Sequence, residues 1–148
     1  LKDSYATLNE DADSSFDIGD MEPNVAGILK KLPTGFVATL YRPFVWEVRK
    51  PIMVLSAIES LFLVFFSVFV IIKVGILKFA KYFTINPIIF LCLLYSIIFA
   101  SLVGISTVNF GTLARYRIPV IPFYYMGFLL VFYEFKTEVK KKQIQNVV

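Results

Sequence analysis

The sequence predicts an all-α, polytopic integral membrane protein with about three transmembrane helices, preceded by amphipathic helices in the membrane interface. Of its 148 residues, 57% are hydrophobic and 17% aromatic, more than a water-soluble domain of this size carries. Charged residues make up only 18% and gather at the ends of the apolar runs. Two of these runs have at least 21 residues, long enough as helices to cross a bilayer core of about 30 Å.

The composition also excludes several kinds of chemistry. Histidine is absent and Cys92 is the single cysteine, so the chain lacks the commonest general base and zinc ligand and cannot form an internal disulfide. We therefore expect no metal site, no cofactor and no self-contained Ser-His-Asp or Cys-His site. The net charge of +4 comes mostly from lysines that flank apolar runs, a pattern that indicates membrane topology and not nucleic-acid binding.

Residues 1–23 form an acidic, polar segment with seven carboxylates against the single base Lys2, and we expect an extracytoplasmic loop. The segment starts at Leu1 and has neither the basic start nor the apolar core of a signal peptide. We interpret the chain as the C-terminal part of a larger polytopic protein, or as a processed one.

Residues 24–50 are predicted to lie in the interface. Val25, Ile28, Leu29 and Leu32 recur at helical spacing, and Pro33 with Gly35 is expected to break this pattern, so that the segment forms one or two amphipathic helices. Aromatic and basic residues suited to the headgroup layer follow: Tyr41, Arg42, Phe44, Trp46, Arg49 and Lys50. We favour a membrane anchor here over the wall of a substrate groove.

The first span is predicted at residues 52–72, directly after Pro51. Its single charge is Glu59, and the spacing puts Glu59 on one helical face with Ser56, Ser60 and Ser67. An unpaired carboxylate in hydrocarbon is costly, so this face is expected to contact protein or water.

The second span is predicted at residues 87–108, without any charge. Ser96, Ala100 and Gly104 recur every four residues and form a small-residue stripe on which other transmembrane helices can pack. A third, shorter run covers residues 120–135, which makes 51–135 a three-helix transmembrane segment.

Two lysine clusters predict the topology. The first lies between spans one and two, and the second lies in the basic tail at residues 136–148; they comprise Lys73, Lys78 and Lys81, and Lys136, Lys140, Lys141 and Lys142. With three spans both clusters fall on one side, which the positive-inside rule makes the cytoplasm. We therefore expect a multi-pass protein of the cytoplasmic (inner) membrane with a cytoplasmic C-terminus.

The best candidate site is the segment 109–122, N-F-G-T-L-A-R-Y-R-I-P-V-I-P, whose prolines are expected to prevent a regular helix. Arg115 and Arg117 lie on the outer side, where the charge rule disfavours them, and guanidinium is suited to phosphate. Thr112 and Asn109 add neutral donors. Glu59 lies about two turns into the first span, within reach of an arginine from this segment. An ion pair of purely structural importance is an equally good interpretation.

The motif R-Y-R-I-P-V-I-P-F, residues 115–123, resembles the C-terminal part of GT-C type membrane glycosyltransferases, which use dolichyl- or polyprenyl-phosphate sugars. L-P-T-G-F-V-A-T-L-Y-R-P-F-V-W-E at 32–47, together with N-F-G-T-L-A-R-Y-R at 109–117, is similar to bacterial surface-polysaccharide proteins of the O-antigen polymerase or ligase type. The resemblance covers residues 32 to about 123.

The resemblance implies a membrane-embedded part of a cell-envelope protein for polysaccharide biosynthesis, acting on a polyprenyl-phosphate-linked sugar. In this hypothesis Arg115 and Arg117 hold the phosphate, Glu59 orients an arginine or takes a proton, and Tyr116 with Tyr124 lines the sugar path. The carboxylate that such transferases use for catalysis lies in an early outer loop, outside this chain. Two alternatives stay open: a non-catalytic membrane scaffold or subunit, and part of a transporter or flippase.

Overall fold

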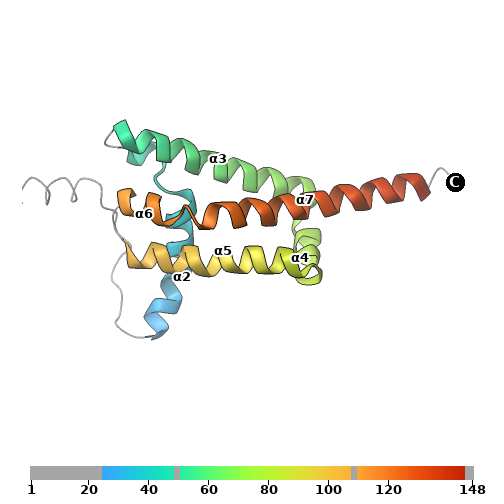
Figure 1. Ribbon diagram of the computed structural model, residues 1–148, viewed down its shortest axis with the longest axis horizontal. Coiled ribbons are helices and arrows are strands. Elements are labelled where there is room, and N and C mark those ends of the chain that lie inside the picture. The colour runs from blue at the N-terminus through green and yellow to red at the C-terminus, as the bar shows by residue number, and fades with distance from the viewer. Residues whose placement is uncertain (1–24, 49–50, 108–109, 146–148) are drawn as a thin grey trace, which may run out of the picture. The chain divides into compact units, whose positions relative to one another are not determined.

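The computed structural model describes residues 25–48, 51–107 and 110–145, and these residues are almost entirely helical (Figure 1). The prediction of an all-α fold is confirmed, since the described residues contain no strand. The elements are α2 (Val25–Tyr41), the 3₁₀ helix η1 (Val45–Glu47), α3 (Pro51–Val74), α4 (Ile76–Ile85), α5 (Pro87–Ser106), α6 (Phe110–Tyr116) and α7 (Val120–Gln145). The acidic segment predicted at 1–23 lies outside the described residues.

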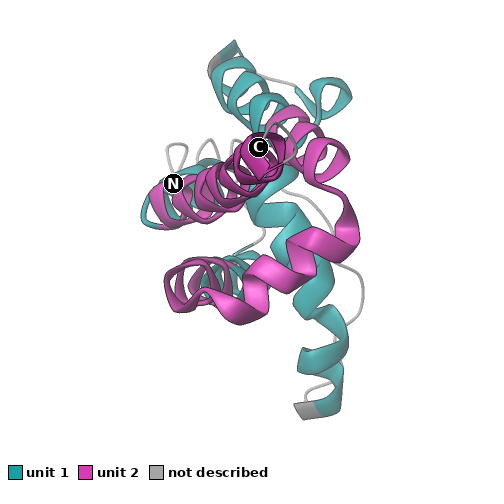
Figure 2. Cartoon of the chain, turned by 90° about the vertical axis from the view of Figure 1, so that its right-hand side faces the viewer, with its two compact units in different colours: residues 1–64, 97–119 teal, residues 65–96, 120–148 magenta. Residues whose placement is uncertain are grey.

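The chain divides into two compact units, coloured separately in Figure 2. Unit 1 comprises residues 1–64 and 97–119, and unit 2 comprises residues 65–96 and 120–148. Helices α3 and α5 each contribute one part to unit 1 and the other part to unit 2.

In unit 1, helix α2 continues through Pro33 and Gly35, so the predicted break is wrong. Pro33 lacks an N–H and removes the helical partner of the Leu29 carbonyl, but Leu29 is exposed, where water can replace that partner. Gly35 packs backbone to backbone against α5: a Cβ atom built on Gly104 would lie 2.0 Å from the Gly35 carbonyl oxygen. The close contact with α5 favours the helical conformation at this position.

Two further interactions hold α2 in unit 1. The buried hydroxyl of Thr39 donates a hydrogen bond of 2.7 Å to the Ala100 carbonyl of α5. Next to this bond is a small apolar core, formed by Ala38, Met53, Val103 and Leu113. The Ala100 and Gly104 part of the small-residue stripe is therefore covered by α2 of the same chain. Ser96, which belongs to unit 2, is buried and donates to the Cys92 carbonyl.

In unit 2, α7 lies between the unit 2 parts of α3 and α5. Ring contacts fix the register: Phe66 with Tyr125 at 5.1 Å between centroids, Phe69 with Phe132 at 5.9 Å, and Tyr95 with Phe123 at 4.6 Å. Residue numbers rise together along α3 and α7, so these helices are parallel. Helices α5 and α7 are antiparallel, because Gly127 contacts Leu93 while Phe123 contacts Tyr95.

Three segments are more helical than the sequence predicts. The lysine-rich connection after the first span forms α4, which begins after Gly75; the φ of 82° at this residue is a left-handed value that favours glycine. Half of the arginine segment forms α6, and only residues 117–119 separate it from α7. Pro122 lies in the first turn of α7, where N–H groups have no intrahelical partner, so it does not interrupt the helix. The basic tail is helical to Gln145.

Among the described residues, two helices are long and apolar enough to cross a membrane, at Met53–Val74 in α3 and at Pro87–Ser106 in α5. Both expose large apolar side chains, among them Leu55 at 76%, Ile72 at 74% and Leu91 at 60%. Such a surface is typical of a helix that contacts lipid.

Candidate functional site

Arg117 is the centre of the polar cluster in unit 1. Its side chain is buried, with 1% of its surface exposed, and its guanidinium donates hydrogen bonds to four acceptors. These are the carboxylate of Glu59, the hydroxyl of Ser60 at 2.8 Å, and the carbonyls of Ser56 at 3.3 Å and Arg42 at 3.4 Å. The Arg117 side chain, in the turn after α6, thereby contacts both α3 and Arg42, the residue that follows α2.

The end of α6 turns Arg117 inward. The backbone N–H of Arg117 donates to the Leu113 carbonyl at 3.0 Å and closes the last turn of the helix. Leu113 is buried in the apolar core of unit 1, so this side of α6 faces the protein. Pro119 has no N–H with which to continue the helical hydrogen bonds. The chain therefore leaves the helix with Arg117 on the buried side.

Glu59 is the partner that reaches the surface, with 45% of its side chain exposed. It lies six residues after Met53, the start of the first candidate span, or about 9 Å along the helix. Ser56 and Ser60 flank it on the same face, as the sequence predicts, and Ser60 is buried. The carboxylate thus contacts a buried cation on one side and stays accessible on the other.

The guanidinium of Arg117 is desolvated, and most of its hydrogen-bonding capacity is taken up by protein acceptors. Its Nε atom is buried and has no hydrogen-bond partner in the part of the chain that the structure describes. The other two nitrogens contact protein acceptors. A substrate approaching this site would therefore meet Glu59 before Arg117.

A second ion pair, which the sequence pattern did not indicate, supports the cluster. The guanidinium of Arg42 contacts both carboxylate oxygens of Glu47, with its Nε at 3.1 Å from Oε2. Burial raises the pKa of Glu47, but hydrogen bonds from Arg42 and from the Phe44 N–H outweigh this effect and hold the pKa below its ordinary value. The Arg42 carbonyl accepts from both Arg117 and Ser60. The Arg42–Glu47 pair thus fixes the backbone that receives Arg117.

The other candidate residues of α6 lie on the surface. Arg115 is exposed, and its guanidinium makes no hydrogen bond or ion pair with the described residues. Tyr116 is 56% exposed and Thr112 is half-buried. Thr112 and Arg115 are three residues apart, so they share one face of α6.

Tyr124 belongs to unit 2, where it is buried and its hydroxyl lies 2.5 Å from the Ser67 hydroxyl. Asn109 lies outside the described residues. Of the predicted site residues, the structure brings Glu59 and Arg117 into contact. Across the described chain, no three His, Cys, Asp or Glu side chains are placed to share a metal ion.

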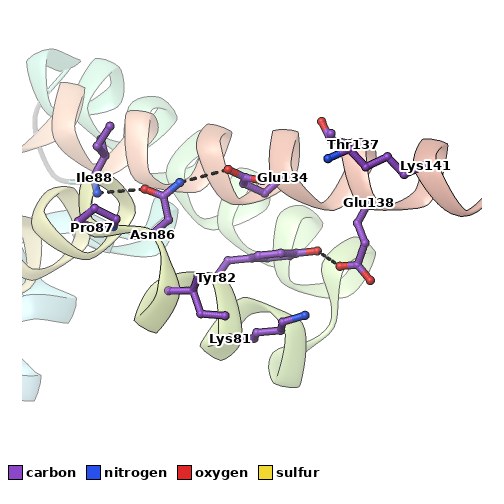
Figure 3. A pocket seen from close by; sticks show the side chains of 10 residues that line it. Lys81, Tyr82, Asn86, Pro87, Ile88, Glu134, Thr137, Glu138 and Lys141 are labelled. Carbon is purple, nitrogen blue, oxygen red and sulfur yellow. Dashed lines mark hydrogen bonds between the residues drawn. The ribbon is translucent and has the colours of Figure 1, made fainter.

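Unit 2 holds a pocket that the sequence analysis missed, with charged, polar and apolar residues in its lining, between α4, the start of α5 and α7 (Figure 3). Asn86 caps α5, since its side-chain oxygen accepts from the backbone N–H of Ile88 at 3.0 Å, and its amide donates to Glu134 at 3.1 Å. An Asn followed by Pro87 at the first helical position is a recognisable start signal for a helix. The contact between Asn86 and Glu134, which are 48 residues apart, is not indicated by any local sequence pattern.

Tyr82 and Glu138 form the other polar contact of this pocket. The phenol donates a 2.5 Å hydrogen bond to the carboxylate, as Figure 3 shows. Burial and the Glu138 and Glu134 carboxylates raise the pKa of Tyr82 to about 12. The Tyr82 hydrogen bond and the Lys142 ammonium lower the pKa of Glu138 to about 2. The phenol is therefore protonated and the carboxylate charged across the physiological range.

Fold and site together define a helical protein with two helices able to span a membrane and a guanidinium–carboxylate pair near the start of the first. No protein-family model, curated protein or solved structure matches the chain. The function is therefore argued from this geometry.

Proposed function

We propose that the chain is the membrane-embedded segment of a protein that handles polyprenyl-linked glycans on the outer face of the cytoplasmic membrane, in glycosyl transfer or glycan polymerisation. The observation that carries this proposal is the contact between the accessible Glu59 carboxylate and the buried Arg117 guanidinium. This contact lies about one and a half helical turns into a candidate span, at the depth where a lipid-linked substrate meets water.

The roles of the residues follow from their exposure. Glu59 is accessible and suited to orient an acceptor hydroxyl or to take its proton, while Arg117 holds the carboxylate in place. Because Arg117 is buried, we assign the phosphate contact to Arg115, whose guanidinium is exposed on α6. Thr112 on the same face adds a hydroxyl donor, and Tyr116 offers an exposed ring to a sugar.

The membrane arrangement that we propose has three spans, with residues 120–135 of α7 as the third. Two observations support it. Ring contacts align this part of α7 with α3 and α5 in unit 2. The two lysine clusters lie at one end of unit 2, where Lys78 of α4 contacts the ring of Phe135 in α7 at 4.8 Å. The positive-inside rule makes this end cytoplasmic, so the Glu59 end of α3 faces outward.

The test is Arg115→Gln, with the variant replacing the natural protein in its host. Losing a hydrogen bond between charged groups costs about 1.5–3 kcal/mol, so we expect a roughly 10- to 150-fold drop in transfer to the lipid-linked glycan. The readouts are the amount and chain length of surface polysaccharide and the level of lipid-linked precursor. Lys30→Gln, which removes another exposed cation of unit 1, is the matched control and should leave both unchanged.

One observation favours a second candidate, a non-catalytic membrane scaffold: the Arg117 guanidinium has four acceptors within its own chain. In that case the cluster serves folding alone. Arg115→Gln would then give normal polysaccharide, while Glu59→Gln would lower protein levels and polysaccharide in the same proportion. If glycan handling holds, Glu59→Gln lowers polysaccharide per molecule of folded protein.

A further inference from the structure

The pocket of unit 2 has a volume of about 550 Å³, in the range of pockets that hold small molecules. Its lining combines charged, neutral polar and apolar side chains: Lys81, Tyr82, Ile85, Asn86, Pro87, Ile88, Glu134, Thr137, Glu138 and Lys141. Figure 3 shows that Tyr82 of α4 and Glu138 of α7 meet across this space. The pocket lies in a different unit from Glu59 and Arg117.

Three charges around the pocket have no opposite charge beside them. The carboxylate of Glu134 accepts a hydrogen bond from the neutral amide of Asn86, and it makes no ion pair with any described residue. Lys81 and Lys141 likewise make no ion pair within the described chain. Glu138 differs, because the Lys142 ammonium lies 3.1 Å from its carboxylate. Besides the Glu138–Lys142 pair, the pocket thus offers the Glu134 carboxylate and two ammonium groups, which Figure 3 shows on either side of the Tyr82–Glu138 contact.

The apolar part of the lining marks where the rest of the ligand lies. Ile85 and Ile88 are 66% and 60% exposed, and Pro87 begins the second candidate span. In a bilayer these side chains contact the parts of the acyl chains nearest the headgroups, whereas the lysines of α4 and α7 lie in the headgroup layer. A ligand that is charged at one end and apolar at the other fits this division.

We propose that the pocket binds phosphatidylethanolamine, with the long side chains of Lys81 and Lys141 reaching the lipid phosphate from either side, the headgroup ammonium on Glu134, and the acyl chains along Ile85 and Ile88. The inference rests on the membrane insertion in the proposed function and not on the glycan chemistry. A phosphate accepts hydrogen bonds from both lysines, and a primary ammonium donates up to three, so it is complementary to a carboxylate.

Other phospholipids match the same charges less well. Phosphatidylglycerol carries a phosphate for the two lysines but presents hydroxyls to the Glu134 carboxylate. Phosphatidylcholine carries a cation without any N–H, so it cannot donate a hydrogen bond to Glu134. We therefore expect the pocket to bind phosphatidylethanolamine more tightly than phosphatidylglycerol or phosphatidylcholine.

The experiment measures the thermal stability of the detergent-purified chain after addition of each of the three lipids, together with lipid retention by native mass spectrometry. We expect the ethanolamine lipid to raise Tm most and to be retained. Lys81→Gln with Lys141→Gln should abolish this shift. Lys140→Gln, which removes the neighbouring exposed lysine outside the pocket lining, should keep it.

Glu134→Gln tests the ammonium contact, because glutamine still accepts the hydrogen bond from Asn86 but has lost the charge. We expect this variant to bind the three lipids equally. An unchanged ethanolamine shift in the double lysine variant, or a larger shift with phosphatidylglycerol in the natural chain, would overturn the proposal. Equal shifts with inorganic phosphate or soluble phosphoethanolamine would also overturn it, since the ligand would then be a small phosphate compound and not a lipid.

Alkaline carbonate extraction separates this inference from the proposed function. If the chain leaves the membrane fraction, the proposed membrane location is wrong. If the chain stays in the membrane and shows no ethanolamine preference, only the lipid site is wrong.

Discussion

The side chain of Arg117 is 1% exposed, while the side chain of Glu59, whose carboxylate contacts the Arg117 guanidinium, is 45% exposed. This asymmetry predicts that removing the more accessible partner is the more damaging change. Glu59→Ala leaves a buried cation without its counterion, which costs about 3 kcal/mol. Arg117→Met leaves a carboxylate that water can solvate, so we expect about 1.5 kcal/mol. Thermal or denaturant unfolding of the two variants in detergent shows which of them is less stable.

The double variant Glu59→Ala with Arg117→Met is the control for this prediction. It contains no unpaired charge, so its stability should exceed that of Glu59→Ala alone. A double variant that is as unstable as the sum of the two single ones would mean that the pair is not coupled in this way.

Gly104→Ala is expected to destabilise the chain, although Ala normally stabilises a helix by about 1 kcal/mol relative to Gly. The added Cβ would lie 2.0 Å from the Gly35 carbonyl oxygen, an atom of the backbone that cannot turn away. We expect a loss of about 3 kcal/mol, at the upper end for overpacking. The measurement is a melting curve beside that of Leu91→Ala, an exposed position of α5 that should melt like the natural chain.

The contact between Tyr82 and Glu138 predicts a stability optimum with two edges. The lowered pKa of Glu138, about 2, contributes stability that is complete above the ordinary pKa of 4.5 and is lost as pH falls toward 2. The raised pKa of Tyr82, about 12, contributes stability that is complete below 10 and is lost as pH rises toward 12.

Melting curves from pH 2 to 12 test both edges. Other carboxylates also titrate at low pH, so the informative quantity is the difference between the natural chain and each variant. The difference from Glu138→Gln should shrink below pH 4.5, and the difference from Tyr82→Phe should shrink above pH 10. Parallel curves over the whole range would contradict the assigned pKa values.

Cysteine labelling tests the proposed topology. In a Cys92→Ala background, Arg115→Cys should react with a membrane-impermeant maleimide from outside intact cells, and Lys140→Cys only after the membrane is opened. Both positions are exposed, so accessibility depends on the side of the membrane alone. Labelling of both from the same side would contradict a third span at residues 120–135.

Composition and periodicity account for much of the fold. Long apolar runs must become helices if they enter lipid, since within a single segment only a helical hydrogen-bond ladder satisfies the backbone there. The predicted first and second spans therefore agree with α3 and α5. The breaks predicted at Pro33 and Gly35 were wrong because local propensity omits the contact with Gly104, which makes a continuous helix favourable. Local rules also missed α4 and most of α6, whose packing partners are far away in sequence.

By itself, the sequence determined that this protein is helical, where its most apolar helices lie, and that Glu59 is the one charge in the apolar run at residues 52–72. It could not separate Arg115 from Arg117, two residues of the same type that differ by about 200° around a helix. Only the tertiary structure decided that Arg117 is buried on Glu59 while Arg115 stays exposed. The physical reason is that hydropathy and residue spacing describe only residues close together in the sequence. Burial of a charge depends on hydrogen-bond acceptors that come together only when the helices pack.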